Sequence, residues 1–202
     1  MKLFLKAGAC SLASHIALEE AGLRYDTESV DLRTKTLASG GDFLKINPKG
    51  YVPALLLDGG ELLTEGPAIL QYVADQAPSK GLAPAAGTLA RYQLQSWLTY
   101  IGTELHKSFS PFFNPAASDD WKAAARANLE RRLGLVNQQL AAQPFLLGEA
   151  FSVADAYLFT VLSWASAIKL DLSAWPALVA FQQRVGARPA VQAVLKDEGL
   201  LG

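Results

Sequence analysis

Short apolar runs alternate with amphipathic segments over the first 80 residues of the chain. Lys2–Leu5 predicts a short strand, and the helically spaced apolar residues of Ser11–Ala21 predict a helix that ends at Gly22. Tyr25–Val30 predicts a second strand. A strand, a helix and a strand within so short a span indicate a parallel pair with a right-handed crossover, so the chain is expected to begin with a βαβ unit.

The next segments predict a hairpin followed by a helix. Val52–Leu57 and Glu61–Leu63 are apolar runs separated by the turn Asp58-Gly59-Gly60, which is typical of a β-hairpin. Pro67 stands at the first position of a segment with one apolar face, which reaches Pro78. A βαβ unit followed by two strands and a helix is the order of a thioredoxin-like domain.

Nearly every segment after about Thr88 has the apolar spacing of a helix. The first of these helices is expected to be long and to bury a stripe made of Leu94, Leu98, Ile101 and Leu105. Ser152 and Asp155 form a capping-box pattern ahead of the apolar segment Ala156–Ile168. The second half therefore predicts a bundle of helices.

Pro78–Gly87 has the composition of a linker, with two prolines, two glycines and several small residues. The sequence therefore predicts an α/β thioredoxin-like N-terminal domain at residues 1–80 and an all-α C-terminal helical bundle at residues 88–202. Half of the 202 residues are apolar, which is enough to build buried cores and argues against a disordered chain.

Charge and composition exclude several classes of partner. The 18 basic and 19 acidic residues leave no polybasic footprint, so neither nucleic acid nor a membrane surface is expected as a partner. Leu3–Leu5 is too short for a signal-peptide core, and Ala156–Ile168 is too short to span a bilayer. A single cysteine cannot form an internal disulfide, which suits a reducing compartment, so a cytoplasmic location is expected.

That cysteine, Cys10, is the first candidate for chemistry. It lies where the first strand meets the following helix, and the unpaired N–H groups at a helix start favour a thiolate. The alternative is a buried, unreactive cysteine. Because the chain has no Cys-x-x-Cys pair, any disulfide chemistry would need an external thiol.

Two backbone features suggest a site for a small peptide. Proline interrupts a strand at Pro53, and a cis bond there would turn the Val52 N–H and C=O towards a bound peptide backbone; an ordinary trans edge proline is the alternative. Thr64-Glu65-Gly66-Pro67 enters a helix whose free N–H groups suit a carboxylate, while Glu65 suits an ammonium group. Simple helix capping is the alternative for this second feature.

Together these motifs resemble those of glutathione transferases over essentially the whole chain. The matching segments are Gly8-Ala9-Cys10-Ser11, Asn47-Pro48-Lys49-Gly50-Tyr51-Val52-Pro53, Thr64-Glu65-Gly66-Pro67-Ala68-Ile69 and Ser152-Val153-Ala154-Asp155. Cys10 and Glu104-Leu105-His106-Lys107 resemble the beta class of bacterial enzymes. The resemblance implies an enzyme that conjugates the thiolate of glutathione to small hydrophobic electrophiles, in the detoxification of xenobiotics.

The resemblance also implies roles for individual residues. Those expected to be catalytic are Cys10, Ser11 and His106. Those expected to bind glutathione are Cys10, Lys35, Val52, Pro53, Glu65, Gly66, Thr99, Thr103, Glu104, Leu105 and His106. Thr99, Thr103 and His106 are spaced to share one face of a helix. Glutathione is expected as co-substrate, with no prosthetic group and no metal, and the enzyme is expected to be a homodimer with much of the electrophile pocket in its helical domain.

Three positions depart from the family pattern. Ala7 stands where a proline is often found, Thr99 where asparagine is frequent, and Gly66 where many transferases have a serine. Gly66 matters most, because it lacks the hydroxyl but retains its backbone N–H, so glutathione binding is expected to persist. His15 is assigned to the structure rather than to the site.

Two other functions stay open. One is a glutathione-dependent thiol–disulfide reductase or reductive dehalogenase that works through a Cys10 mixed disulfide. The other is a non-catalytic ligand carrier or a partner of the transcription machinery, which the presence of Cys10, Lys35, Glu65 and His106 argues against. A further set of residues is a candidate for the electrophile pocket, although an ordinary core role is favoured for it: Phe109, Phe112, Phe113, Trp164 and Ile168.

Overall fold

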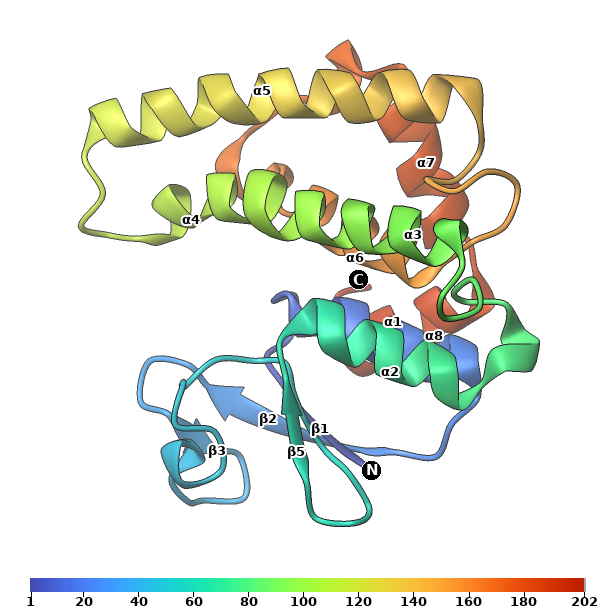
Figure 1. Ribbon diagram of the computed structural model, residues 1–202. Coiled ribbons are helices and arrows are strands. Elements are labelled where there is room, and N and C mark those ends of the chain that lie inside the picture. The colour runs from blue at the N-terminus through green and yellow to red at the C-terminus, as the bar shows by residue number, and fades with distance from the viewer. Residues whose placement is uncertain (202) are drawn as a thin grey trace. The chain divides into compact units, whose positions relative to one another are not determined.

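The computed structural model describes residues 1–201, which divide into two compact units. The first unit contains residues 1–83 together with residues 187–201, and the second contains residues 84–186. The elements of both units carry the labels of Figure 1.

The first unit is built on a five-stranded sheet with the strand order β3-β2-β1-β4-β5. Strand β1 is parallel to β2, with Leu3 opposite Thr27, and antiparallel to β4, with Leu3 opposite Leu55. This arrangement confirms the predicted thioredoxin-like fold. The elements are β1 (Lys2–Leu5), α1 (Ser11–Ala21), β2 (Asp26–Asp31), β3 (Thr36–Leu37), β4 (Ala54–Leu56), β5 (Leu62–Thr64) and α2 (Gly66–Gln76).

The segment between β2 and β4 holds structure that the sequence did not predict. Strand β3 has only two residues, too few to show an alternating pattern, and it pairs antiparallel with the end of β2. A 3₁₀ turn, η1 (Phe43–Lys45), follows and is capped by Asp42, whose side chain accepts from the Leu44 N–H. Strand β3 falls within a polar stretch of the sequence, and η1 follows directly after it.

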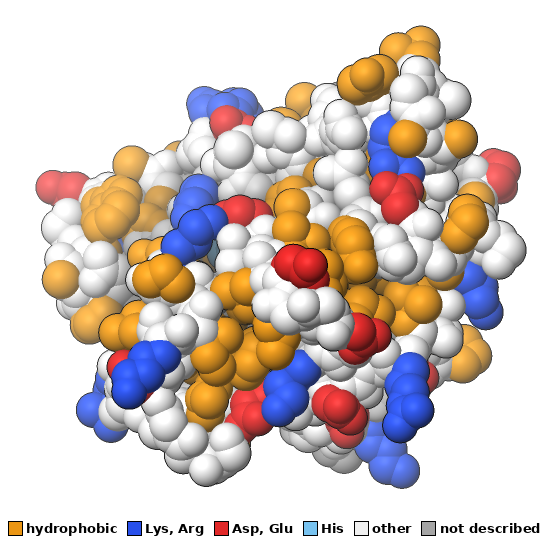
Figure 2. Space-filling view, turned by 60° about the horizontal axis from the view of Figure 1, so that its bottom comes forward, with side chains coloured by type: hydrophobic (Ala, Val, Ile, Leu, Met, Phe, Trp, Pro, Cys, Tyr) orange, Lys and Arg blue, Asp and Glu red, His pale blue; other side chains and the backbone are white. Residues whose placement is uncertain are grey.

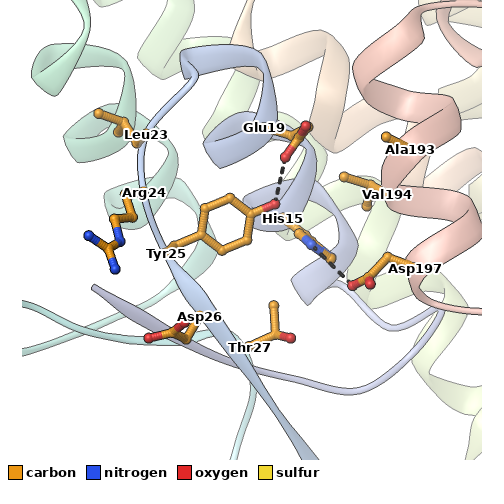
Figure 3. A pocket seen from close by; sticks show the side chains of 10 residues that line it. All are labelled: His15, Glu19, Leu23, Arg24, Tyr25, Asp26, Thr27, Ala193, Val194 and Asp197. Carbon is orange, nitrogen blue, oxygen red and sulfur yellow. Dashed lines mark hydrogen bonds and ion pairs between the residues drawn. The ribbon is translucent and has the colours of Figure 1, made fainter.

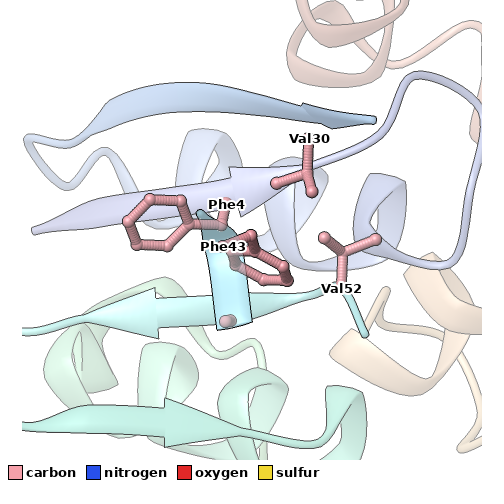
Figure 4. Close-up of a cluster of buried hydrophobic side chains, with 5 residues drawn as sticks. Phe4, Val30, Phe43 and Val52 are labelled. Carbon is pink, nitrogen blue, oxygen red and sulfur yellow. The ribbon is translucent and has the colours of Figure 1, made fainter. Parts of the chain in front are cut away.

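A cluster of buried apolar side chains holds this segment against the sheet (Figure 4). Phe43 packs against Phe4 of β1, with ring centroids 5.7 Å apart. Val30, Val52 and Ala54 complete the cluster. Because successive strand residues face opposite sides, Phe4 lies on the face opposite to its neighbours along β1. The cluster therefore anchors the segment around Val52, which matters for the site.

Helices α1, α2 and α8 (Pro189–Asp197) lie together in the first unit (Figure 1). Helix α1 ends at Gly22, whose left-handed backbone (φ 66°) accounts for the glycine there and confirms the predicted end. Helix α8 packs on α1, and the Arg188 guanidinium holds both carboxylate oxygens of Glu20 at 2.6 and 2.8 Å.

The position of α8 corrects the expected boundary at the C-terminus. Residues 88–202 were expected to form one helical bundle, but residues 187–201 group with the thioredoxin-like unit. Val191 and Val194 are buried there, and the Glu20 ion pair fixes the helix to α1. A helical sequence pattern indicates that one face of the helix is buried, but it does not indicate which element packs against that face.

The second unit is entirely helical, as predicted. Its stripe of Leu94, Leu98, Ile101 and Leu105 is fully buried, and the Ser152–Asp155 capping box is present. Its main elements are α3 (Leu89–Tyr100), η3 (Ile101–His106), α4 (Lys107–Phe113), α5 (Asp119–Ala142), α6 (Val153–Ser163) and α7 (Pro176–Gly186). The single-turn 3₁₀ helices of the chain besides η1 are η2 (Pro78–Lys80), η4 (Ser166–Ile168) and η5 (Leu172–Ala174).

The predicted long helix is interrupted by the π-helical segment η3. A π-helix has a wider turn than an α-helix, so each residue beyond it is rotated relative to an uninterrupted helix. The i, i+4, i+7 spacing of Thr99, Thr103 and His106 therefore does not place all three on one face.

Along the described residues, no helix is both long and apolar enough to cross a bilayer. On the face drawn in Figure 2, acidic and basic side chains are interspersed with apolar ones, and neither sign of charge forms a continuous patch. This distribution agrees with the near-neutral balance of the sequence.

Candidate active site

Cys10 lies at the N-cap of α1 and is partly exposed. Its Sγ lies 3.1 Å from the carbonyl oxygen of Val52 and donates to it, so the sulfur carries its proton in this arrangement. The turn before the helix is closed by the Ala9 N–H, which donates to the Lys6 carbonyl at 2.9 Å. The predicted neighbours Cys10 and Val52 are thus brought together, although 42 residues separate them along the chain.

Ser11, the first residue of α1, bonds to the end of β1. Its side chain is buried, and its hydroxyl accepts from the Lys6 N–H at 3.1 Å and donates to the Lys6 carbonyl at 3.2 Å. The hydroxyl therefore acts both as acceptor and as donor, and the two hydrogen bonds hold the end of β1 against the start of α1. The Ser11 side chain therefore stabilises the turn that carries Cys10, and a catalytic role for Ser11 stays a prediction.

The peptide bond between Val52 and Pro53 is cis, as predicted. Asn47 shapes the loop before it: its buried side-chain amide donates to the Tyr51 carbonyl at 2.7 Å, and its oxygen accepts from the Lys49 N–H at 3.2 Å. No individual role was predicted for Asn47 beyond its place in the turn before Pro53. An asparagine ahead of a Pro-x-Gly turn was the available signal, since its side chain favours such turns.

Lys35 reaches the same loop from the segment between β2 and β3. Its Nζ donates to the Gly50 carbonyl at 2.9 Å and lies 5.8 Å from the centroid of the Tyr51 ring. The lysine is partly exposed, so a cationic group borders the loop that ends at Pro53. The structure therefore places Lys35 beside the predicted peptide-binding loop.

Glu65 occupies the N-cap of α2 with a positive φ of 71°, which is unfavourable for a residue with a side chain. Its carboxylate pairs with Lys49 Nζ at 2.7 Å, and the same Nζ donates to the Thr64 hydroxyl at 3.0 Å. The carboxylate is 68% exposed and thus open to a ligand. Lys49 was not predicted as a site residue, because a surface lysine in a turn carries no pattern of its own.

Gly66 begins α2 and faces the cis proline. A Cβ built on Gly66 would lie 3.9 Å from Pro53 Cγ, which is an ordinary contact. The start of α2 and the loop at Pro53 are therefore neighbours. Within the first unit, the structure gathers Cys10, Val52, Pro53, Glu65 and Gly66 around these two segments.

In the second unit, His106 is turned onto the aromatic side chains of its own unit. Its Nδ1 lies 2.8 Å from the Tyr157 hydroxyl, and its ring lies 4.9 Å from the Trp164 ring in an edge-on arrangement. Burial, with a smaller effect of Lys107, lowers the pKa of His106 to about 4. The imidazole is therefore neutral at pH 7, and it can donate one hydrogen bond but carries no charge.

The other predicted residues of this unit have varied surroundings. Glu104 pairs with the Arg132 guanidinium at 2.6 and 2.7 Å, while Leu105 is a fully buried core residue. Thr99 and Thr103 are exposed, and the Thr103 hydroxyl donates to the Thr99 carbonyl at 3.0 Å. The Leu105 side chain is thus part of the core, and a contact of this residue with glutathione stays a prediction.

Two of the aromatic residues considered for an electrophile pocket, Phe109 and Phe113, pack against Trp164, whereas the Phe112 ring lies 5.5 Å from the Arg126 guanidinium. The ring centroids of Phe109 and Phe113 lie 5.6 and 5.9 Å from that of Trp164. Phe109 is fully buried, whereas Phe113 is exposed. Core packing therefore accounts for Phe109, and the exposed part of this aromatic cluster offers an apolar surface. No group of residues suited to a metal ion is found within the described part of the chain.

Two family models match the chain. One, for the N-terminal domain of glutathione S-transferases, matches residues 7–76, and the other, for the C-terminal domain, matches residues 100–189. Glutathione S-transferase GstA of Escherichia coli O157:H7 is 52% identical over 200 residues, with 99% of this chain and all of the relative covered.

Solved structures agree with these matches. A bacterial beta-class glutathione S-transferase of Sphingomonas chungbukensis has a TM-score of 0.97 at 51% identity and covers the whole of both chains. A sphingomonad glutathione S-transferase complexed with glutathione has a TM-score of 0.96 at 52% identity, over 99% of this chain and 100% of that one. The fold, the cysteine at the start of α1 and this similarity over the full length agree, and the chain belongs to the glutathione S-transferase family, among the bacterial beta-class enzymes.

Proposed function

We propose that this transferase conjugates the thiolate of glutathione to small hydrophobic electrophiles and thereby serves the detoxification of xenobiotics. The observation that carries the proposal is the cluster of Cys10, Val52, Pro53, Glu65 and Gly66 in one unit. A thiol, a strand-like backbone and a helix start with an adjacent carboxylate match the three chemical parts of the tripeptide: its sulfur, its peptide bonds and its γ-glutamyl end.

The γ-glutamyl end of glutathione carries an ammonium and a carboxylate. In this proposal the carboxylate binds at the N-terminus of α2, where the backbone N–H of Gly66 and the helix dipole favour an anion. The ammonium binds the exposed carboxylate of Glu65, which is held by Lys49. The salt bridge to Lys49 orients Glu65 before the ligand arrives, so that less side-chain entropy is lost on binding.

The cysteinyl part of glutathione pairs with the backbone of Val52, which brings its sulfur near Cys10. The thiol proton that Cys10 donates to the Val52 carbonyl can turn instead to the sulfur of glutathione and stabilise it as a thiolate. Lys35 binds a ligand carboxylate at the far side of the same loop. The contributions of Thr99, Thr103, Glu104 and His106 rest on the family resemblance.

The functional form is proposed to be a homodimer in the bacterial cytoplasm, with glutathione as co-substrate and no prosthetic group. Apolar side chains that stand in solvent on each unit support self-association. Tyr51 is 70% exposed on the loop before Pro53, and Leu89 and Tyr92 are exposed on the first turns of α3. Sedimentation at micromolar concentration tests this part, because a monomer alone would contradict it.

The reductase and dehalogenase alternatives rest on Cys10 alone, and the presence of Cys10, Lys35, Glu65 and His106 argues against the non-catalytic alternative. The similarity to named transferases supports conjugation over both. The test is retention on immobilised glutathione together with turnover of an activated aryl halide. Binding with turnover is the expected result, whereas binding without turnover of any electrophile would support a carrier.

A further inference from the structure

A buried carboxylate outside the proposed glutathione site touches the turn that carries Cys10. Glu198 follows α8 as its C-cap, with its N–H donating to the Val194 carbonyl at 2.9 Å. Its side chain is only 1% exposed, which is rare for a glutamate unless it is paired. One oxygen, Oε2, accepts from the Gly8 N–H at 2.9 Å. Gly8 lies two residues before Cys10.

The second oxygen of Glu198 is held by a buried histidine. Oε1 lies 2.9 Å from Nδ1 of His15, whose side chain is 2% exposed on α1. Because a carboxylate oxygen only accepts, Nδ1 carries the proton in this hydrogen bond. A single carboxylate therefore joins three parts of the first unit: the turn before Cys10, helix α1 and the end of α8.

His15 is itself fixed from the other side. Figure 3 shows its ring near Tyr25 and Asp197, on the wall of a cavity of about 580 Å³. The Tyr25 ring meets it edge-on at 5.5 Å and 87°, and Nε2 lies 3.7 Å from Asp197 Oδ2. The Tyr25 hydroxyl donates to Glu19 at 2.9 Å. The imidazole is thus set in one orientation, which in turn sets the carboxylate of Glu198.

We propose that Glu198, oriented by His15, is a positioning residue that holds the Gly8–Cys10 turn and so sets the place of the Cys10 sulfur. Gly8 has a left-handed backbone (φ 70°), and a charge-assisted hydrogen bond to its N–H stabilises that conformation. The turn ends at Cys10, whose Sγ meets the Val52 carbonyl. The consequence for conjugation rests on the proposed function, whereas the effect on Cys10 itself does not.

The sole cysteine of the chain makes a direct test possible. Alkylation of the protein by iodoacetamide without glutathione reports on Cys10 alone. In Glu198→Ala we expect the alkylation rate constant to change at least about threefold, and kcat for an activated aryl halide to fall about tenfold with KM for glutathione little changed, because a small misplacement of a reacting group is costly. A protein that conjugates nothing would refute the proposed function and still leave the alkylation test valid.

The chain offers a matched control. Glu20→Ala also removes a carboxylate that ties α1 to the α8 region, through Arg188, but it does not reach the Gly8 turn. It is expected to lower Tm while leaving the alkylation rate unchanged. Equal effects of Glu20→Ala and Glu198→Ala would overturn the proposal, because general loosening of α8 would then account for both.

Two further variants separate positioning from folding. Glu198→Gln retains an oxygen for the Gly8 N–H, and its amide can donate to His15 in the other tautomer, so we expect it to restore most of the wild-type alkylation rate and kcat. Glu198→Asp keeps the charge but is one methylene shorter and cannot reach both partners; we expect a partial loss even if Glu198→Ala does not fold. Wild-type alkylation and kcat in Glu198→Asp would contradict the proposal.

Discussion

Gly66→Ser is the substitution for which the structure allows the sharpest expectation. Many transferases have a serine at this place, and here the glycine has no conformational reason to be one: its φ is not positive, and an added Cβ would lie 3.9 Å from Pro53 Cγ. The serine is therefore accommodated without strain. Its hydroxyl would stand at the N-terminus of α2, beside the N–H groups proposed to bind the γ-glutamyl carboxylate.

The size of the effect follows from the new hydrogen bond. A hydrogen bond to a charged group contributes about 1.5 to 3 kcal/mol, and ordering the serine side chain offsets part of that, so a net gain of about 1.5 kcal/mol is expected. This corresponds to about tenfold tighter binding of glutathione. Replacing this glycine also raises the free energy of unfolding by up to about 0.5 kcal/mol, because serine or alanine leaves the unfolded chain with less conformational entropy than glycine does.

Gly66→Ala separates these two effects, because it makes the same backbone change without the hydroxyl. Titration calorimetry with glutathione is expected to give about a tenfold lower Kd for Gly66→Ser than for Gly66→Ala. Thermal unfolding is expected to show a similar small rise in Tm for both. Equal Kd values for the two variants would refute the placement of the ligand carboxylate at Gly66.

Three further predictions concern separate groups. Glu65→Ala is expected to weaken glutathione binding by about 1.5 to 3 kcal/mol in calorimetry with little loss of fold, because the ligand ammonium loses its charge partner; unchanged affinity would remove Glu65 from the site. Cys10→Ser is expected to keep part of the aryl-halide conjugation and to abolish any mixed disulfide with glutathione, as seen by mass spectrometry; complete loss of conjugation with binding intact would make Cys10 itself the nucleophile. Burial raises the pKa of Asp155 to about 6 from 3.8. The contribution of Asp155 to the free energy of unfolding is therefore largest below pH 3.8 and falls as the pH rises from 3.8 to about 6. The difference in unfolding free energy between the wild type and Asp155→Asn should therefore shift by about 3 kcal/mol across that window in denaturant titrations, and a constant difference would contradict this.

Local sequence patterns were sufficient to predict those elements whose structure depends on residues close together in the sequence. The strand at Lys2–Leu5, the end of α1 at Gly22 and the capping box at Ser152 all depend on residues within a few positions of one another. The buried stripe from Leu94 to Leu105 was predicted for the same reason. The cis bond at Pro53 was predicted because a proline cannot donate to the hydrogen-bond ladder of the strand that it opens, so its place there requires a special backbone geometry.

Local patterns were not sufficient where a residue's partner is distant or where several roles suit one residue type. The bonds of the Ser11 hydroxyl to the backbone of Lys6 were not predicted, because a serine at a helix start suits several roles. Lys49 acquires its role only through Glu65 on the following helix. The π-helical segment η3, which changes the direction of the side chains along this helix, was also not predicted, because a π-helical turn has no strong sequence signal.

The placement of α8 has a consequence for how the molecule is made. Residues 187–201 belong to the thioredoxin-like unit, so this unit is assembled from two stretches of chain that enclose the whole helical unit between them. During synthesis, residues 84–186 emerge before the thioredoxin-like unit has received its last helix. Because the Gly8 N–H is bonded to Glu198, the turn that carries Cys10 gains this contact only after residues 84–186 have been translated, and under the positioning proposal the Cys10 sulfur reaches its final place at that stage.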